Sequence, residues 1–130
     1  MPGLPAAPEG PISPRLIYHC SLVADWQAAQ AVGEYTFSSR GRTLEQEGYV
    51  HASYPGQVAG VLQRFYADVT EPMCLLAVDP DKLGVPVIAE NLTGGHEPFP
   101  HIYGAVPVTA VVEVAALVRD AQSGWRSPVG

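Results

Sequence analysis

Three histidines, each in a short segment of β-forming residues, are the side chains best suited to chemistry in this sequence. They occur in the segments Leu16-Ile17-Tyr18-His19, Tyr49-Val50-His51-Ala52 and His101-Ile102-Tyr103. An imidazole titrates near neutral pH, so it serves as a general acid or base, hydrogen-bonds a sugar hydroxyl, or binds a metal ion. The elements that carry the rings decide which of these roles is open.

Side-chain alternation in strands predicts which way the three rings point. Residues two apart share a face, which groups His19 with Ile17, His51 with Tyr49 and Ser53, and His101 with Tyr103. Each histidine stands at or near a strand end, directly before a helix or loop, where sheet proteins commonly bind ligands. We therefore predict one pocket lined by His19, His51 and His101. The alternative is three separate histidines, each satisfied locally at a strand end.

A metal site is the less favoured use of these rings. Closely spaced ligand pairs such as H-E-x-x-H or H-x-H are absent from the sequence, although metal ligands can come from separate strands. We expect no metal, and a metal-dependent hydrolase using the three histidines stays as an alternative.

A carboxylate and three tyrosines are further candidates for the pocket. Glu90 ends an apolar strand and would bring a negative charge to the pocket, unless it is simply a solvated strand end. Tyr18, Tyr49 and Tyr103 lie beside the histidines and would contact a ligand, with a role in the core or at the pocket rim as the alternative.

An anionic group of a ligand would find its partners around Ser53 and a basic loop. Ser53 opens a helix directly after His51, where it serves as the N-cap or belongs to an anion site at the helix N-terminus. Arg40 and Arg42 would bind a phosphate through their guanidinium groups, or else belong to a solvated loop.

The two cysteines are predicted to be structural. Cys20 would point away from the face of His19, and Cys74 lies inside an apolar strand, so both are interpreted as small buried thiols. Two cysteines without a C-x-x-C pair are too few for a disulfide framework.

The spacing of apolar residues predicts two main helices in the first half of the chain. The first begins after an N-cap at Ser21 and ends at Gly33, and the second carries an apolar stripe from Val58 to Phe65. Between them, Thr43 to Gln46 fits a capping box that opens one helical turn. Strands are predicted at 16–19, 49–52, 74–78, 85–89 and 108–118.

This order predicts a small single α+β domain, with the two main helices packed on a mostly antiparallel or split β-sheet. Prolines recur through residues 1–14, which we expect to be a flexible tail. The folded domain would span residues 15–121, and residues 122–130 would form a flexible C-terminal tail from which Trp125 docks back.

Composition disfavours two kinds of partner. The 130 residues carry 13 acidic and 7 basic side chains, a net charge of −6, which disfavours a nucleic-acid surface and binding to anionic membranes. No signal peptide or membrane-spanning run is found in the sequence, so a cytoplasmic protein is expected. The expected partner is a small molecule, and the sequence leaves the oligomeric state open.

Three segments together resemble a known family. Ile17-Tyr18-His19, Glu47 to Ser53, and Phe99 to Gly104 are similar to an uncharacterised bacterial family, domain of unknown function 952, over about residues 16–117. The departures are conservative: Tyr49-Val50 stands where a Phe-Ile pair is more usual, and Ala52 where a cysteine is expected.

A more distant resemblance links the same segments to the ADP-ribosyltransferase superfamily. It implies an ADP-ribosyltransferase-like fold and NAD as the substrate. His19 would bind a ribose hydroxyl, and His51 or Tyr49 would pack against the nicotinamide. The carboxylate that steadies the cationic ribose would be Glu90, or its role would pass to His101.

The resulting hypothesis is an enzyme that acts on NAD or a related ADP-ribosyl compound, as an ADP-ribosyltransferase or an NAD glycohydrolase. Breaking the bond from ribose to nicotinamide makes a cationic sugar, which needs orientation and a nearby electron-rich group. The alternative of a different class is a non-catalytic module that binds a nucleotide or a small anion in the same pocket.

Overall fold

The computed structural model describes residues 16–92 and 97–130, and two three-stranded antiparallel sheets organise it. The central sheet has the order β1-β6-β10, from Ile17–Leu22, Met73–Val78 and Val111–Ala116. The second has the order β5-β8-β7, from Val50–His51, Phe99–Ile102 and Val87–Glu90. The tail expected at residues 1–14 lies outside the described residues.

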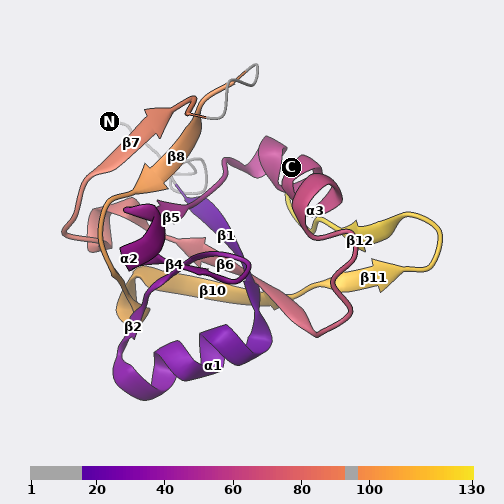
Figure 1. Ribbon diagram of the computed structural model, residues 1–130, viewed down its shortest axis with the longest axis horizontal. Helices are drawn as coiled ribbons and strands as arrows, with labels where there is room; N and C mark the ends of the chain where they lie inside the picture. The colour runs from indigo at the N-terminus through magenta and orange to yellow at the C-terminus, as the bar shows by residue number, and fades with distance from the viewer. Residues whose placement is uncertain (1–15, 93–96) are drawn as a thin grey trace, which may run out of the picture.

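Three two-stranded ribbons complete the strands of the described residues. They are β2 (Glu34–Tyr35) with β9 (Val106–Pro107), β3 (Phe37–Ser39) with β4 (Arg42–Thr43), and β11 (Val118–Asp120) with β12 (Gly124–Arg126). Figure 1 shows the β7–β8 ribbon at one end of the molecule and the β11–β12 hairpin at the opposite end. The prediction of an α+β domain with split, antiparallel sheets is confirmed.

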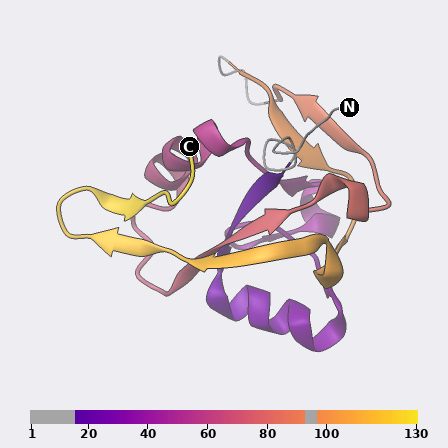
Figure 2. The same ribbon diagram turned by 180° about the vertical axis from the view of Figure 1, so that it is seen from behind.

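Three α-helices occur in the described residues: α1 (Val23–Val32), α2 (Leu44–Glu47) and α3 (Val58–Phe65). The two longer ones, α1 and α3, are the two predicted main helices. Figures 1 and 2 show them on opposite sides of the central sheet, with α3 close to the β11–β12 hairpin.

Strand β6 is buried along its whole length because both of its faces are covered. Its alternate side chains divide between two hydrophobic clusters, as the period of two requires. Leu76 belongs to the cluster that contains Ala29 of α1, and Leu75 belongs to the cluster that contains Leu62 of α3. This strand therefore anchors both helices, and its predicted apolar character is confirmed.

Local capping signals are confirmed at two of the predicted positions. The Thr43 side chain accepts a hydrogen bond from the backbone N–H of Gln46, whose side chain accepts one from the Thr43 N–H. Gly33 ends α1 with a φ of 93°, a left-handed conformation that glycine adopts without strain.

The two predicted serine N-caps are wrong, because both serines are paired with a neighbouring strand. Ser21 lies in β1 opposite Cys74, and the chain turns into α1 one residue later, at Leu22. Ser53 exchanges two backbone hydrogen bonds of 2.8 Å with Tyr18, and a 3₁₀ turn at Pro55–Gln57 separates it from α3.

The predicted long strand at 108–118 is divided in the structure. A 3₁₀ turn at Val108–Ala110 comes first, β10 then pairs with β6 through a register shift after Val111, and β11 begins only at Val118. Part of the expected C-terminal tail is ordered as well, because Gly124–Arg126 is β12. The Trp125 indole N–H donates to the carbonyl of Tyr66 at 3.0 Å, so Trp125 does dock onto the body.

Replacing Thr43 with alanine is expected to lower the free energy of unfolding by about 1 kcal/mol, because the first turn of α2 loses its side-chain cap. Urea unfolding of Thr43→Ala checks this, with Thr70→Ala, at an exposed threonine, as the matched control. Equal losses in the two variants would mean that the capping box contributes nothing specific.

No helix of the described residues is long and apolar enough to cross a membrane.

Candidate functional site

A cavity of about 630 Å³ opens between α3 and the second sheet, and the volume suits a small-molecule ligand. Its wall contains polar groups on the side of the sheets and apolar side chains on the side of α3 and the approach to β8. The polar part includes His51, Ser53, Glu90 and His101; the apolar part includes Val61, Phe65, Leu92 and Phe99. The site therefore combines a few convergent polar groups with an apolar wall.

His51 and His101 meet directly, as predicted. The two residues are cross-strand partners in the ladder of β5 and β8, and their ring centroids are 5.4 Å apart. Tyr49 stacks on the His101 ring at 4.2 Å and meets the His51 ring edge-on at 4.9 Å. Antiparallel pairing between segments fifty residues apart thus brings two imidazoles to one wall of the cavity.

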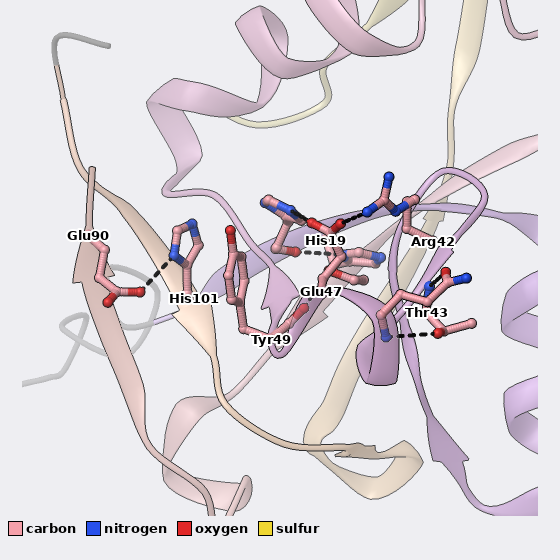
Figure 3. Close-up of polar contacts among 10 residues, drawn as sticks. His19, Arg42, Thr43, Glu47, Tyr49, Glu90 and His101 are labelled. Carbon is pink, nitrogen blue, oxygen red and sulfur yellow. Dashed lines mark hydrogen bonds and ion pairs between the residues drawn. The ribbon is translucent and has the colours of Figure 1, made fainter. Parts of the chain in front are cut away.

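His101 is held by a carboxylate from the neighbouring strand. Its Nδ1 donates to Glu90 Oε1 at 2.9 Å (Figure 3), and the Tyr103 hydroxyl donates to the same oxygen at 2.5 Å. The hydrogen bonds from Tyr103 and His101 lower the pKa of Glu90, and the bond to Glu90 raises the pKa of Tyr103 to about 12. Glu90 is therefore ionised at neutral pH, and Oε1 carries both bonds.

His51 is bonded to a carboxylate of its own, Glu47, which was not predicted from the sequence. Its Nε2 donates to Glu47 Oε1 at 3.3 Å, and Arg42 binds the other oxygen of Glu47 at 2.6 Å (Figure 3). Burial is the larger cause of a lowered pKa for His51, and Glu47 acts in the opposite direction. Glu47 stands four residues before His51, in the segment that carries the family resemblance. This short spacing is the feature of the sequence that could have indicated the contact between them.

His19 lines the cavity, but both of its ring nitrogens are used inside the protein. Nδ1 donates to the backbone carbonyl of His51 at 2.5 Å, and Nε2 lies 2.9 Å from the hydroxyl of Tyr35. A carbonyl only accepts, so Nδ1 carries the proton. The Tyr35 hydroxyl, which contacts Nε2, donates its own hydrogen to Ser21 Oγ at 2.9 Å. Burial lowers the pKa of His19 to about 4. The ring joins β1 to β5 and has no nitrogen left for a ligand.

The two arginines that were expected to bind a phosphate each bind a carboxylate of the protein instead. Arg40 lines the cavity rim and forms two hydrogen bonds with Asp68, at 2.7 and 3.3 Å, whereas Arg42 binds Glu47. Arg64, which was not predicted from the sequence, also lines the cavity and has no carboxylate partner among the described residues. It lies on the exposed last turn of α3. The helical periodicity of the sequence identified only the apolar residues of this helix and gave no indication for a residue on its polar face.

The remaining candidate site residues either line the cavity or contact residues that line it. Tyr18 and Ser53 line the cavity, and Ser53 is only 4% exposed. Tyr49 and Tyr103 do not line the cavity, but Tyr49 stacks on His101 and the Tyr103 hydroxyl donates to Glu90. Burial raises the pKa of the Cys20 thiol to about 12, so the thiol stays protonated and remains a poor nucleophile.

Within residues 16–92 and 97–130, no group of three histidine, cysteine or acidic side chains has a geometry that could hold a metal ion. His19, the third histidine of the predicted set, is also committed to Tyr35 and the His51 carbonyl. The described residues therefore offer no ligand set for a metal-dependent hydrolase, and His96 lies outside them.

Comparison with known proteins identifies similar structures and the family of the chain. The X-ray structure of protein CC0527 from Caulobacter crescentus is 30% identical and covers 85% of this chain and 93% of its own, with a TM-score of 0.73. The solution NMR structure of the same protein is 30% identical, covers 85% of this chain and 90% of its own, and has a TM-score of 0.69. No curated protein matches the chain. A family model matches residues 20–114, so the chain belongs to the family described as "Protein of unknown function (DUF952)".

Proposed function

We propose that the chain is an enzyme that acts on NAD or a related ADP-ribosyl compound in the cavity lined by His51, Glu90 and His101. The observation that carries the proposal is the ionised Glu90 at the wall of a cavity large enough for such a ligand. Oε1 of Glu90 accepts from His101 and Tyr103, and Oε2 would be the oxygen that faces a ligand. A fixed carboxylate is the group that stabilises a developing ribosyl cation.

This assignment resolves the choice between Glu90 and His101 in favour of the carboxylate. Glu90 would stabilise the cationic ribose, and His101 would hold Glu90 in position through its Nδ1–H. The distant resemblance to ADP-ribosyltransferases supports the substrate class. The ribose-anchoring role expected for His19 has to be given up within this proposal, because both nitrogens of that ring are bonded.

Arg64 supplies the contact for the pyrophosphate. Arg64 is exposed, lines the cavity and has no ion pair within the described residues, so binding a phosphate there breaks no internal salt bridge. Guanidinium groups bind phosphate oxygens through paired hydrogen bonds. The apolar wall around Phe65 and Phe99 would accept the flat ring of a base.

Titration with NAD, followed by the imidazole resonances in NMR spectra, tests the proposal. Saturable shifts are expected for His51 and His101, and HPLC should detect nicotinamide released during incubation. Arg64→Gln is expected to weaken binding about tenfold through the lost charge-assisted hydrogen bonds, while Lys82→Gln, at an exposed lysine outside the cavity, should not. The absence of any shift at millimolar NAD would refute the proposal. Saturable binding without nicotinamide release would favour a non-catalytic nucleotide-binding module.

A further inference from the structure

We propose that His51, oriented by Glu47 and Arg42, is the general base that accepts a proton from water, so that the reaction is hydrolysis of the bond from ribose to nicotinamide. This inference rests on the proposed function and deepens it by naming the acceptor. Two features support it: a chain of three polar side chains that ends at His51, and the open position of that ring at the cavity.

The three side chains form a relay that fixes the His51 ring. Arg42 of β4 binds Glu47 Oε2 at 2.6 Å, and Glu47 Oε1 accepts from His51 Nε2 at 3.3 Å. Arg42 thereby orients the carboxylate, and the carboxylate orients the imidazole. A base held in one orientation by a carboxylate is the arrangement that general-base catalysis uses.

The relay also selects the tautomer of His51. A carboxylate only accepts, so Nε2 carries the proton and Nδ1 of the neutral ring carries the lone pair. No side chain or backbone group of the described residues bonds to Nδ1, and the His51 side chain is 36% exposed where it lines the cavity. By contrast, the His101 side chain is 4% exposed. His51 is thus the imidazole that water can reach.

The chemical step balances without another reactant. The oxygen of water forms a bond to the ribose carbon while the bond from that carbon to the nicotinamide nitrogen breaks. The electron pair of the broken bond goes to nicotinamide, which leaves as a neutral molecule. His51 Nδ1 takes one proton from the water and later releases it to solvent, so the products are ADP-ribose, nicotinamide and a proton.

The groups around His51 set the direction of its pH response. Glu47 faces the ring from α2, His101 from β8 and Tyr49 from the segment before β5, while His19 of β1 binds its backbone carbonyl. Burial and His101 lower the pKa of His51, and Glu47 raises it. At neutral pH His51 is therefore neutral and ready to accept a proton, and removal of Glu47 should lower its pKa further.

The pH dependence of nicotinamide release by the full chain tests this role, in the wild type and in Glu47→Gln. We expect kcat to fall about 100-fold in Glu47→Gln, which is within the range of general-base effects, with KM changed little. The acidic limb of the pH profile should move to lower pH. Glu45→Gln, at an exposed glutamate of the same helix, is the matched control and should leave both properties unchanged.

A second readout separates a catalytic role from a structural one. In ¹⁵N NMR spectra the wild-type His51 ring should be protonated at Nε2 in its neutral form, and Glu47→Gln should lose this preference. Arg42→Gln, which keeps Glu47, should show a smaller fall in kcat and serves if Glu47→Gln does not fold.

Each outcome bears on the inference. Loss of kcat together with the shifted acidic limb and the changed tautomer supports it. Nicotinamide release with the wild-type rate and acidic limb in Glu47→Gln would overturn it and leave the proposed function standing. A wild type that binds NAD without releasing nicotinamide would overturn the catalytic function and this inference together.

Discussion

Nicotinamide release from NAD is expected to fall about 1000-fold in Glu90→Gln, a loss typical of removing one well-placed electrostatic contact to a transition state. The neutral amide still accepts hydrogen bonds from His101 and Tyr103, so the wall of the cavity keeps its shape. What is lost is the negative charge opposite the developing ribosyl cation. Binding of NAD in the ground state should change much less than kcat.

Single-turnover measurements of nicotinamide release, with NAD affinity measured in parallel, check this expectation. Glu34→Gln is the matched control, because Glu34 is an exposed carboxylate on β2 and does not line the cavity. A kcat in Glu90→Gln within a few-fold of the wild type would contradict the role of Glu90. A weakened affinity with unchanged kcat would assign Glu90 to binding instead.

Acidification is expected to destabilise the folded protein through His19. The unfolded chain carries a histidine with an ordinary pKa near 6.5, whereas burial lowers the pKa of His19 in the folded state to about 4. The stabilisation is therefore complete above the ordinary value and is lost progressively as the pH falls towards the folded value. Over the whole window the difference amounts to about 3 kcal/mol.

Urea unfolding at neutral pH and near pH 5 measures this effect, and about 2 kcal/mol of the loss should already be present at the lower pH. His19→Asn should be less stable at neutral pH, because Tyr35 and the His51 carbonyl lose their shared partner. It should also lose most of the pH dependence, while the contribution of His51 remains. The same pH dependence in His19→Asn and the wild type would show that another group is responsible.

Much of the local structure was predictable because neighbouring residues determine it. Thr43 and Gln46 satisfy each other across one helical turn, and Gly33 ends α1 with the left-handed backbone that glycine allows. The apolar run of β6 predicted a strand buried on both faces. The serine caps failed for the opposite reason: Ser21 and Ser53 look like caps locally, but pairing with distant strands decided their conformation.

In the candidate site, too, features set by neighbouring residues were predictable, and features set by distant contacts were not. Alternation predicted that His51 and His101 would each face a pocket, and Glu90 was expected at its edge; all three line the cavity. The sequence did not indicate which carboxylate accepts a hydrogen bond from which imidazole. The Glu90–His101 bond, for example, depends on the register of β7 against β8.

By itself, then, the sequence determined the α+β class, the two main helices, the caps at Thr43 and Gly33, and the identity of the polar residues available to a site. Only the tertiary structure decided that His19 is bound to Tyr35 and that Arg40 turns to Asp68, far along the chain. The physical reason is that capping and alternation act between residues close in sequence. The hydrogen-bond partner and the burial of a ring depend on strand register and helix packing, which the whole folded chain sets together.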